Sequence, residues 1–299
     1  MPKKPSPHLA AALQALFVAF LWSTSWVLIK IGLKDIPALT FAGLRYALAF
    51  VCLLPFAMQP APRAAIRRLG VSAWTRLAAL GILFYTLTQG AQFVALNHLA
   101  AATVNLILSF TTVLVALLGI ALLAERPTVL QWAGAALYLI GAAVYFYPAA
   151  LAAEQGLGVA ATLVALAANA GASVLGRRVN RAGDISPLVV TTASMGIGSV
   201  VLLGAGIATQ GLPPLTPTHW AIVAWLAVVN TAFAFTLWNH TLRTLSAMES
   251  SIINNTMLIH IPILAWLFLG EALTGQQIAG LILAGLGTLV VQLRFHRKQ

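Results

Sequence analysis

Two stretches that lie 146 residues apart, ERPTVLQWAG at residues 125–134 and EALTGQQIAG at residues 271–280, share the pattern Glu-x-x-Thr-x-x-Gln-x-Ala-Gly. The same shift aligns Leu96 with Leu242. Matches between alanine- and leucine-rich segments arise easily by chance, whereas a shared order of glutamate, threonine and glutamine does not. The pattern therefore indicates an internal repeat, which largely determines the architecture of a chain.

The composition excludes the soluble classes of protein. Of the 299 residues 60% are hydrophobic and 8% are charged, whereas soluble chains have about 45–50% and 25%. The mean hydropathy is +0.92. The net charge of +11 reflects 17 basic residues against 6 acidic ones, so it does not indicate a nucleic-acid partner. We expect an all-α integral membrane protein, with membrane lipid around it.

Ten mostly apolar stretches have about the 20 residues that a helix needs to cross a bilayer. Helices are expected because a backbone in lipid must satisfy its own hydrogen bonds. The predicted spans are 9–31, 38–58, 73–96, 100–123, 128–148, 157–178, 186–208, 219–242, 246–269 and 274–294.

Each half of the chain, residues 1–150 and residues 151–299, holds five predicted spans. Because five is odd, the second half enters the membrane in the opposite sense to the first. Inverted repeats of this kind are typical of secondary transporters, in which the substrate site lies near the midplane between the repeats.

The basic residues predict the orientation. Cytoplasmic segments carry an excess of lysine and arginine, and with both termini in the cytoplasm 14 of the 17 basic residues fall on that side. They are Lys3, Lys4, Arg63, Arg67, Arg68, Arg76, Arg126, Arg177, Arg178, Arg181, Arg243, Arg294, Arg297 and Lys298. The opposite side holds Lys30 and Lys34, and Arg45 lies inside the second span.

The chain resembles the drug/metabolite transporter superfamily, in particular its EamA family of ten-helix carriers. The resemblance rests on LWST at 21–24, PALTFAGLRY at 37–46, LLAER at 122–126 and FLGEALT at 268–274. It implies a carrier that works as a monomer in the bacterial inner membrane and exports amino acids or related small metabolites. The LWST segment is similar to that of aromatic amino acid exporters. Sugars, nucleosides, carboxylates and cationic drugs remain open as substrates.

Arg45 is the most prominent candidate for binding the substrate. It lies about eight residues into its span, roughly 12 Å along the helix axis. Charged residues inside a membrane are costly and often functional. Arg45 either has a structural role, in which it reaches back to the outer interface or caps a carbonyl group, or it attracts a substrate carboxylate or anchors a gate.

Polar and aromatic residues in four spans complete the candidate site. Tyr85, Gln89 and Gln92 have the spacing of one helical face, which lines a cavity or bonds to a neighbouring helix. His260 is either a core histidine or a titratable site. The predicted substrate-binding residues are Trp22, Thr24, Arg45, Tyr85, Gln89, Gln92, Asn230, Trp238, Asn254 and His260.

The remaining motifs argue against other mechanisms. No phosphate-binding loop and no metal-ligand pattern occurs in the sequence, so we expect no cofactor, no metal and no enzyme. A membrane enzyme, which would need a convergent catalytic cluster, and a scaffold or channel subunit are the alternative classes. All six acidic residues fall at or beyond the ends of the spans. Glu125 and Glu271 are interpreted as helix-end anchors, and coupling to protons through a carboxylate is not expected.

Overall fold

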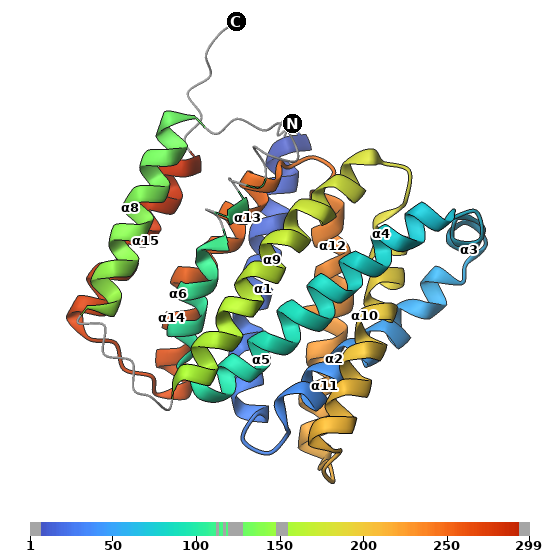
Figure 1. Cartoon of the computed structure of the whole chain (residues 1–299), viewed down its shortest axis with the longest axis horizontal. Coiled ribbons are helices and arrows are strands. Elements are labelled where there is room, and N and C mark those ends of the chain that lie inside the picture. Colours follow the sequence, from blue (N-terminus) through green and yellow to red (C-terminus); the bar gives the residue numbers. More distant parts are fainter. Residues whose placement is uncertain (1–6, 112–113, 116–117, 119–127, 148–154, 293–299) are drawn as a thin grey trace, which may run out of the picture.

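The structure is a computed structural model that describes residues 7–111, 114–115, 118, 128–147 and 155–292, and all the regular elements in these ranges are helical. The first half contains α1 (Pro7–Gly32), α2 (Ala38–Ala57), α3 (Pro60–Arg67), α4 (Val71–Gly81), η1 (Ile82–Thr88), α5 (Gln89–His98), α6 (Ala101–Ser109) and α8 (Val129–Phe146). The second half contains α9 (Gly156–Ala182), α10 (Pro187–Gln210), α11 (Pro217–Ala227), η3 (Val228–Phe233), α12 (Ala234–Thr241), α13 (Ala247–Asn255), α14 (Met257–Leu269) and α15 (Gly275–Gln292). Figure 1 shows these helices as one bundle.

Six of the described helical segments are long and apolar enough to cross a membrane. They are Pro7–Gly32, Ala38–Ala57, Val71–His98, Gly156–Ala182, Pro187–Gln210 and Pro217–Thr241, and they match the first three and the sixth to eighth predicted spans. Shorter apolar helices occupy Trp132–Phe146 and Ile253–Leu269. All-helical membrane architecture is therefore confirmed, while the count of ten spans stays a prediction.

The predicted ninth span is not one continuous helix. It divides into α13 and α14 at Thr256, whose hydroxyl donates to the Ile253 carbonyl. Pro262 lies inside α14 and supplies no backbone N–H to the preceding turn. Much of the second half of the fourth span, and the basic termini that predict the orientation (residues 1–6 and 293–299), lie outside the described residues.

The helix boundaries repeat along the chain with the offset seen in the sequence. Helices α4, α6 and α8 begin at Val71, Ala101 and Val129, and α11, α13 and α15 each begin 146 residues later. The third predicted span of each half also contains a π-helical segment at the equivalent place, η1 and η3. The two halves thus share their local structure as well as their motif.

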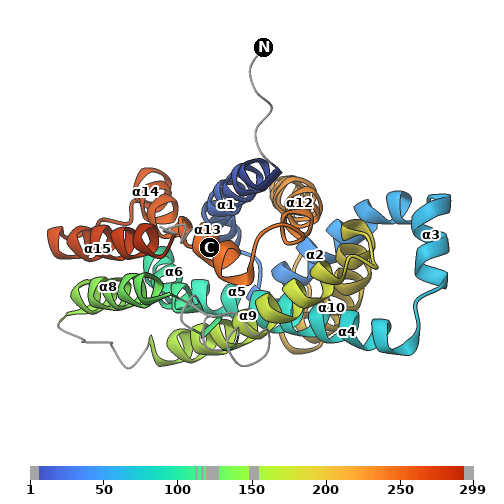
Figure 2. The same ribbon diagram turned by 90° about the horizontal axis from the view of Figure 1, so that it is seen from above.

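The equivalent helices α8 and α15 pack directly against each other (Figure 2). A Cβ atom on Gly141 would lie 2.6 Å from the carbonyl oxygen of Gly280, and one on Gly287 would lie 2.6 Å from that of Gly134. The earlier glycine of α8, Gly134, meets the later glycine of α15, Gly287, and Gly141 meets Gly280. The two helices are therefore antiparallel. Small residues let the two backbones approach closely, so these glycines serve the packing of the two helices.

A second contact between the two repeats lies inside the bundle. Asn255 donates from Nδ2 to the Ser109 carbonyl at 3.2 Å, and these two residues are themselves 146 positions apart. Equivalent residues that touch each other lie on the approximate twofold axis relating the two halves. Helices α2 and α10 likewise meet closely, because a Cβ atom on Gly43 would lie 2.5 Å from the Cα atom of Leu203.

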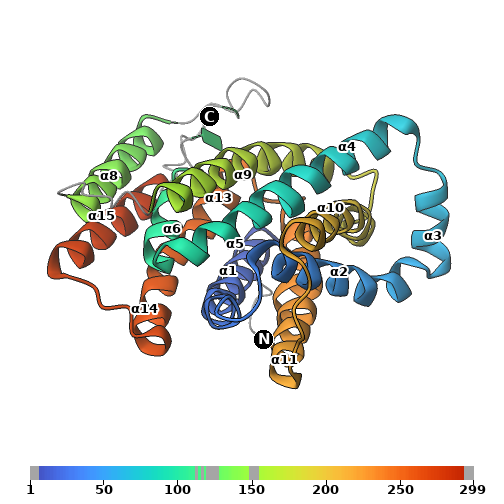
Figure 3. The same cartoon turned by 60° about the horizontal axis from the view of Figure 1, so that its bottom comes forward.

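The short helix α3 stands at the edge of the molecule and joins α2 to α4, on the opposite side from the α8–α15 pair (Figure 3). None of its residues is buried. Pro60 and Pro62 lie in its first turn, where a missing backbone N–H costs no hydrogen bond.

Candidate functional site

A cavity lies within the bundle between the two halves of the chain. Its walls come from α1, α2, the α4–η1–α5 segment and α6 of the first half, and from α9, α12, α13 and α14 of the second. Six of the predicted site residues line it: Trp22, Arg45, Gln89, Gln92, Trp238 and Asn254. Helices α8 and α15 contribute no lining residue among those described.

One wall of the cavity is aromatic. The Trp22 ring lies 5.0 Å from Trp238 and 4.8 Å from Phe235, measured between ring centroids. The Trp22 indole Nε1 donates to the Asn230 carbonyl at 3.1 Å, which fixes the plane of the ring. Aromatic faces held in this way can stack on a flat apolar group of a ligand.

Arg45 is the charged residue of the described lining. Its side chain is 2% exposed. Nε donates to Thr231 Oγ1 at 2.7 Å and Nη2 to the Asn230 carbonyl at 3.3 Å, and the guanidinium carbon lies 5.1 Å from the centroid of the Tyr46 ring. Arg45 therefore caps a carbonyl group, as one of the structural alternatives predicted, and it does not reach back to the interface. It crosses from α2 to η3 and presents a fixed positive charge to the cavity.

Carboxamide groups supply most of the remaining polarity. They belong to Gln89, Gln92, Asn105, Asn169, Asn239, Asn254 and Asn255. Several are held by the protein: Asn105 donates to the Met257 carbonyl at 2.9 Å, and Asn239 donates to Thr191 Oγ1 at 2.7 Å. Asn254 Oδ1 is buried and has no hydrogen-bond partner in the described part of the chain. Such an acceptor suits a donor group on a ligand.

The π-helical segment η1 explains why Tyr85 does not share a face with Gln89 and Gln92. A π turn bonds residue i to i+5 and shifts the phase of the side chains that follow. The Thr88 hydroxyl donates to the Leu83 carbonyl, five residues earlier. Tyr85 turns away from the lining and is 1% exposed, with its ring 5.5 Å from Tyr46 and 5.3 Å from Phe235. It supports the aromatic wall from behind.

Thr24 and Asn230 also lie outside the lining, and the Asn230 side chain bonds instead to α1. Asn230 Nδ2 donates to the Leu21 carbonyl at 2.5 Å and to Thr24 Oγ1 at 3.2 Å. The pair joins α1 to η3. His260 lies on α14 with its ring edge-on to Phe20, 5.7 Å between centroids, outside the cavity wall.

The sequence analysis did not identify every residue that lines the cavity. Asn105, Ser109 and Thr111 follow one another on α6 and just beyond it, and Asn169 and Ser173 lie one turn apart on α9. Their polarity within apolar spans could have identified them as lining residues. Small polar residues of this type also bond to their own helix, as Ser109 does to the Asn105 carbonyl and Ser173 to the Asn169 carbonyl.

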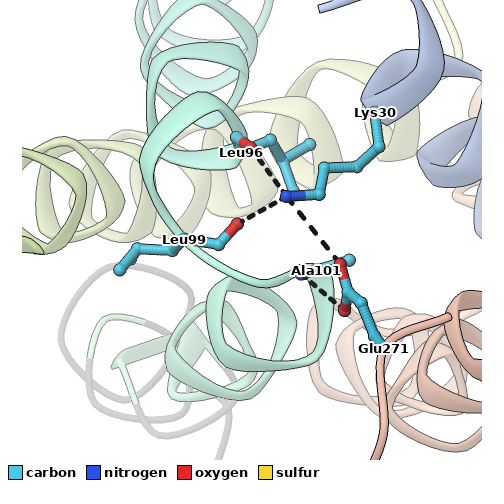
Figure 4. Close-up of polar contacts among 5 residues, drawn as sticks. All are labelled: Lys30, Leu96, Leu99, Ala101 and Glu271. Atoms are coloured by element: carbon cyan, nitrogen blue, oxygen red, sulfur yellow. Dashed lines mark hydrogen bonds and ion pairs between the residues drawn. The ribbon is translucent and has the colours of Figure 1, made fainter. Parts of the chain in front are cut away.

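Polar contacts of Lys30 and Glu271, called the strap below, join the end of α1 to α5, α6 and the segment after α14 (Figure 4). Lys30 Nζ donates to the carbonyl oxygens of Leu96 at 3.2 Å and Leu99 at 3.0 Å, and it lies 3.8 Å from Glu271 Oε1. The Glu271 carboxylate accepts from the Ala101 backbone N–H at 3.1 and 3.2 Å and so caps α6. Glu271 is thus a helix-end anchor, as the sequence suggested, and it ties the second half of the chain to the first.

The strap lies directly beyond the cavity, because lining residue Trp26 is one turn before Lys30. Its chain path depends on Gly270, whose φ of 67° ends α14 in the left-handed region that glycine accepts readily.

The opposite end of the bundle has a related contact. Arg177 Nη1 donates to the Leu242 carbonyl at 2.5 Å, and Leu242 is the repeat equivalent of Leu96. In the first half Lys30 of α1 donates to the Leu96 carbonyl, and in the second half Arg177 of α9 donates to the equivalent Leu242 carbonyl. Glu125, the repeat equivalent of Glu271, lies outside the described residues.

Known proteins resemble the chain along nearly its whole length. It matches the EamA-like transporter family over residues 9–147 and again over residues 156–293. A probable amino-acid metabolite efflux pump of Salmonella typhimurium is 28% identical over 95% of both chains. An S-adenosylmethionine/S-adenosylhomocysteine transporter of Chlamydia trachomatis is 26% identical over 85% of this chain and 80% of its own. A crystal structure superimposes with a TM-score of 0.74 at 19% identity, over 94% of this chain and 97% of the other, which indicates a shared fold.

Proposed function

We propose, because this chain belongs to the EamA-like transporter family, that it is a secondary transporter that exports small metabolites, with amino acids, including aromatic ones, as the best substrates. The observation that carries the proposal is the cavity between the repeats. It combines the Arg45 guanidinium, the buried acceptor Asn254 Oδ1 and the aromatic wall around Trp22 and Trp238.

These three features correspond to the three parts of an aromatic amino acid. The guanidinium pairs with the carboxylate, which it can meet in bidentate geometry. The amide oxygen of Asn254 accepts from the ammonium group, and the side chain stacks on the indoles. The described lining holds no acidic residue, so cationic drugs and the sulfonium group of S-adenosylmethionine are less well matched. Nucleosides and simple carboxylates are the alternatives within the family.

The topology that accompanies this function is ten spans in two inverted repeats, residues 1–150 and 151–299, with both termini in the cytoplasm of a bacterial inner membrane. Support comes from the two family matches, the antiparallel packing of α8 and α15, and the bias of basic residues to one side. The transport unit is one chain.

Alternating access follows from the ties at the two ends of the bundle. The strap of Lys30 and Glu271 closes the cavity at one end, and its opening exposes the cavity to that side of the membrane. The hydrogen bond from Arg177 to the Leu242 carbonyl belongs to the closure at the opposite end of the cavity. In an inverted repeat the two closures are related by the same twofold axis, so a rocking of one repeat against the other opens one as it closes the other.

Purified protein in liposomes tests the function. Labelled phenylalanine and tryptophan should leave preloaded vesicles down their gradient without ATP, and the exported molecule should be chemically unchanged. S-adenosylmethionine, a nucleoside and a quaternary ammonium drug serve as competing substrates. No flux of any amino acid would refute the substrate class, and a chemically altered product would instead indicate a membrane enzyme.

The aromatic wall provides the test of specificity. Trp238→Leu should reduce the preference for tryptophan over alanine by about fivefold, since an aromatic pair contributes about 0.5–1.5 kcal/mol beyond its buried area. Trp225→Leu is the matched control, because Trp225 is 56% exposed and outside the lining. Equal loss in both variants would place the aromatic selectivity elsewhere.

A further inference from the structure

A second hollow lies on the side of the bundle, away from the central cavity. It is an apolar groove of about 710 Å³ between α2, α3, α4 and α10. This volume is in the usual range for small-molecule sites, about 300–1,000 Å³. Its walls are formed mainly by Phe50, Leu54, Met58, Trp74, Ile197 and Val200.

The mouth of the groove is basic. Arg63 and Arg67 line it from the exposed helix α3. They are four residues apart, so both lie on one face of that helix. The described lining residues include no acid that would neutralise them, and neither arginine has a resolved salt bridge.

The groove also holds an unpaired polar group. Thr192 lines it and is 3% exposed, and its hydroxyl has no hydrogen-bond partner in the described part of the chain. A buried hydroxyl of this kind is normally satisfied by the protein, by water or by a ligand. The groove therefore combines a long apolar wall, one buried hydroxyl and two cationic groups at its mouth.

We propose that this groove binds an anionic phospholipid, with the phosphate on Arg63 and Arg67 and the acyl chain along Phe50, Leu54 and Ile197. Planar guanidinium groups match the oxygens of a phosphate. Basic residues beside membrane-spanning helices attract anionic lipids electrostatically. A soluble anion would make no use of the apolar wall, and an uncharged lipid would leave both arginines without a counter-ion, so one molecule with both properties fits best. The site is separate from the central cavity and does not depend on what that cavity transports.

Native mass spectrometry of the detergent-purified chain tests the proposal. Phosphatidylglycerol should bind more tightly than phosphatidylcholine of the same acyl length. Arg63→Gln combined with Arg67→Gln should weaken phosphatidylglycerol binding by about 25-fold, at about fivefold for each basic residue. Arg178→Gln combined with Arg181→Gln is the matched control, because it removes the same charge from exposed positions outside the groove. Equal binding of the two lipids, or equal loss in both double variants, would overturn the proposal.

The apolar wall needs its own test. Val200 is 66% exposed and lines the groove, so Val200→Trp should fill part of it without disturbing the core. We expect severalfold weaker phosphatidylglycerol binding, with the native fold retained in a thermal melt. Unchanged binding would overturn the placement of the acyl chain. Inorganic phosphate should not displace the lipid, and displacement at millimolar phosphate would show that the arginines bind a free anion instead.

Discussion

Among single residues, Arg45 has the clearest link between structure and substrate. Burial of a charge without a partner is costly, and the described hydrogen bonds of Arg45 use Nε and Nη2 with two neutral acceptors, Thr231 and the Asn230 carbonyl. The guanidinium is therefore held in place but not neutralised. A substrate carboxylate would supply the missing negative charge.

Arg45→Gln should raise the apparent KM for phenylalanine by about tenfold or more, since hydrogen bonds to charged groups contribute about 1.5–3 kcal/mol. The KM for phenylalaninamide, which lacks the carboxylate, should change much less. Lys34→Gln, at an exposed position outside the lining, controls for the loss of one positive charge. Uptake kinetics in liposomes are the measurement. An equal effect on both compounds would reduce Arg45 to a structural tie between α2 and η3.

At the scale of helices, the α8–α15 contact leads us to predict a variant that loses thermal stability but keeps its transport kinetics. Gly141→Ala places a Cβ atom 2.4 Å from the Ala284 backbone nitrogen, so the two helices must separate. Gly285→Ala is the control in α15, because its Cβ atom would meet Ile259 at an ordinary 3.5 Å. We expect a lower thermal midpoint for Gly141→Ala, and little change or a gain for Gly285→Ala, since alanine favours a helix by about 1 kcal/mol.

The KM of Gly141→Ala should stay near that of the parent, because the described side chains of both helices lie outside the cavity lining. A parent-like melting temperature would contradict the close packing of the two backbones.

The strap at the end of α1 makes a second prediction at this scale. Lys30→Gln removes the ion pair with Glu271 and leaves the carboxylate as the cap of α6. In a background with Cys52→Ser and Ser109→Cys, a membrane-impermeant thiol reagent should reach the cavity from the Lys30 side about fivefold faster, because a partly exposed pair contributes up to about 1 kcal/mol. Lys34→Gln should leave the labelling rate unchanged. A rate equal to the parent in Lys30→Gln would show that the strap does not hold this end closed.

The sequence predicted where the helices lie along the chain better than it predicted which side of each helix faces the cavity. Helix ends such as Ala38 and Gln210 follow from hydropathy and polar breaks, and the repeat follows from the glutamate motif. Which side chains face the cavity depends on the phase of each helix. A π turn before Gln89 changes that phase without any distinctive residue, so a regular α-helical spacing wrongly placed Tyr85 on the same face. The contact of Lys30 with Glu271 joins residues far apart in the chain, which no local pattern reveals.

Over the whole molecule, the charged side chains of the described residues lie toward the ends of the bundle, and Arg45 is the exception among them. The described acids are Asp35, Asp184, Glu249 and Glu271, which lie in loops or at helix ends. Asp35 meets His219 at 3.2 Å, and Glu249 meets His8 at 3.4 Å and caps its own helix through the Ser246 N–H. Inside, the cavity presents Arg45. This distribution differs from that of proton-driven carriers, which keep a carboxylate near the midplane.

We therefore predict transport without obligatory coupling to protons through a carboxylate. Glu271 holds a helix end and a lysine and lies outside the cavity lining, and Glu125 is its repeat equivalent. In liposomes, counterflow exchange of labelled phenylalanine should persist in the Glu125→Gln and Glu271→Gln double variant, with some loss of thermal stability because the α6 cap is weakened. An imposed pH gradient should give the parent no uphill accumulation, and a proton ionophore should leave exchange unchanged. Accumulation that is driven by the pH gradient in the parent and lost in the double variant would contradict the prediction, because the end-of-helix glutamates would then carry protons during the cycle.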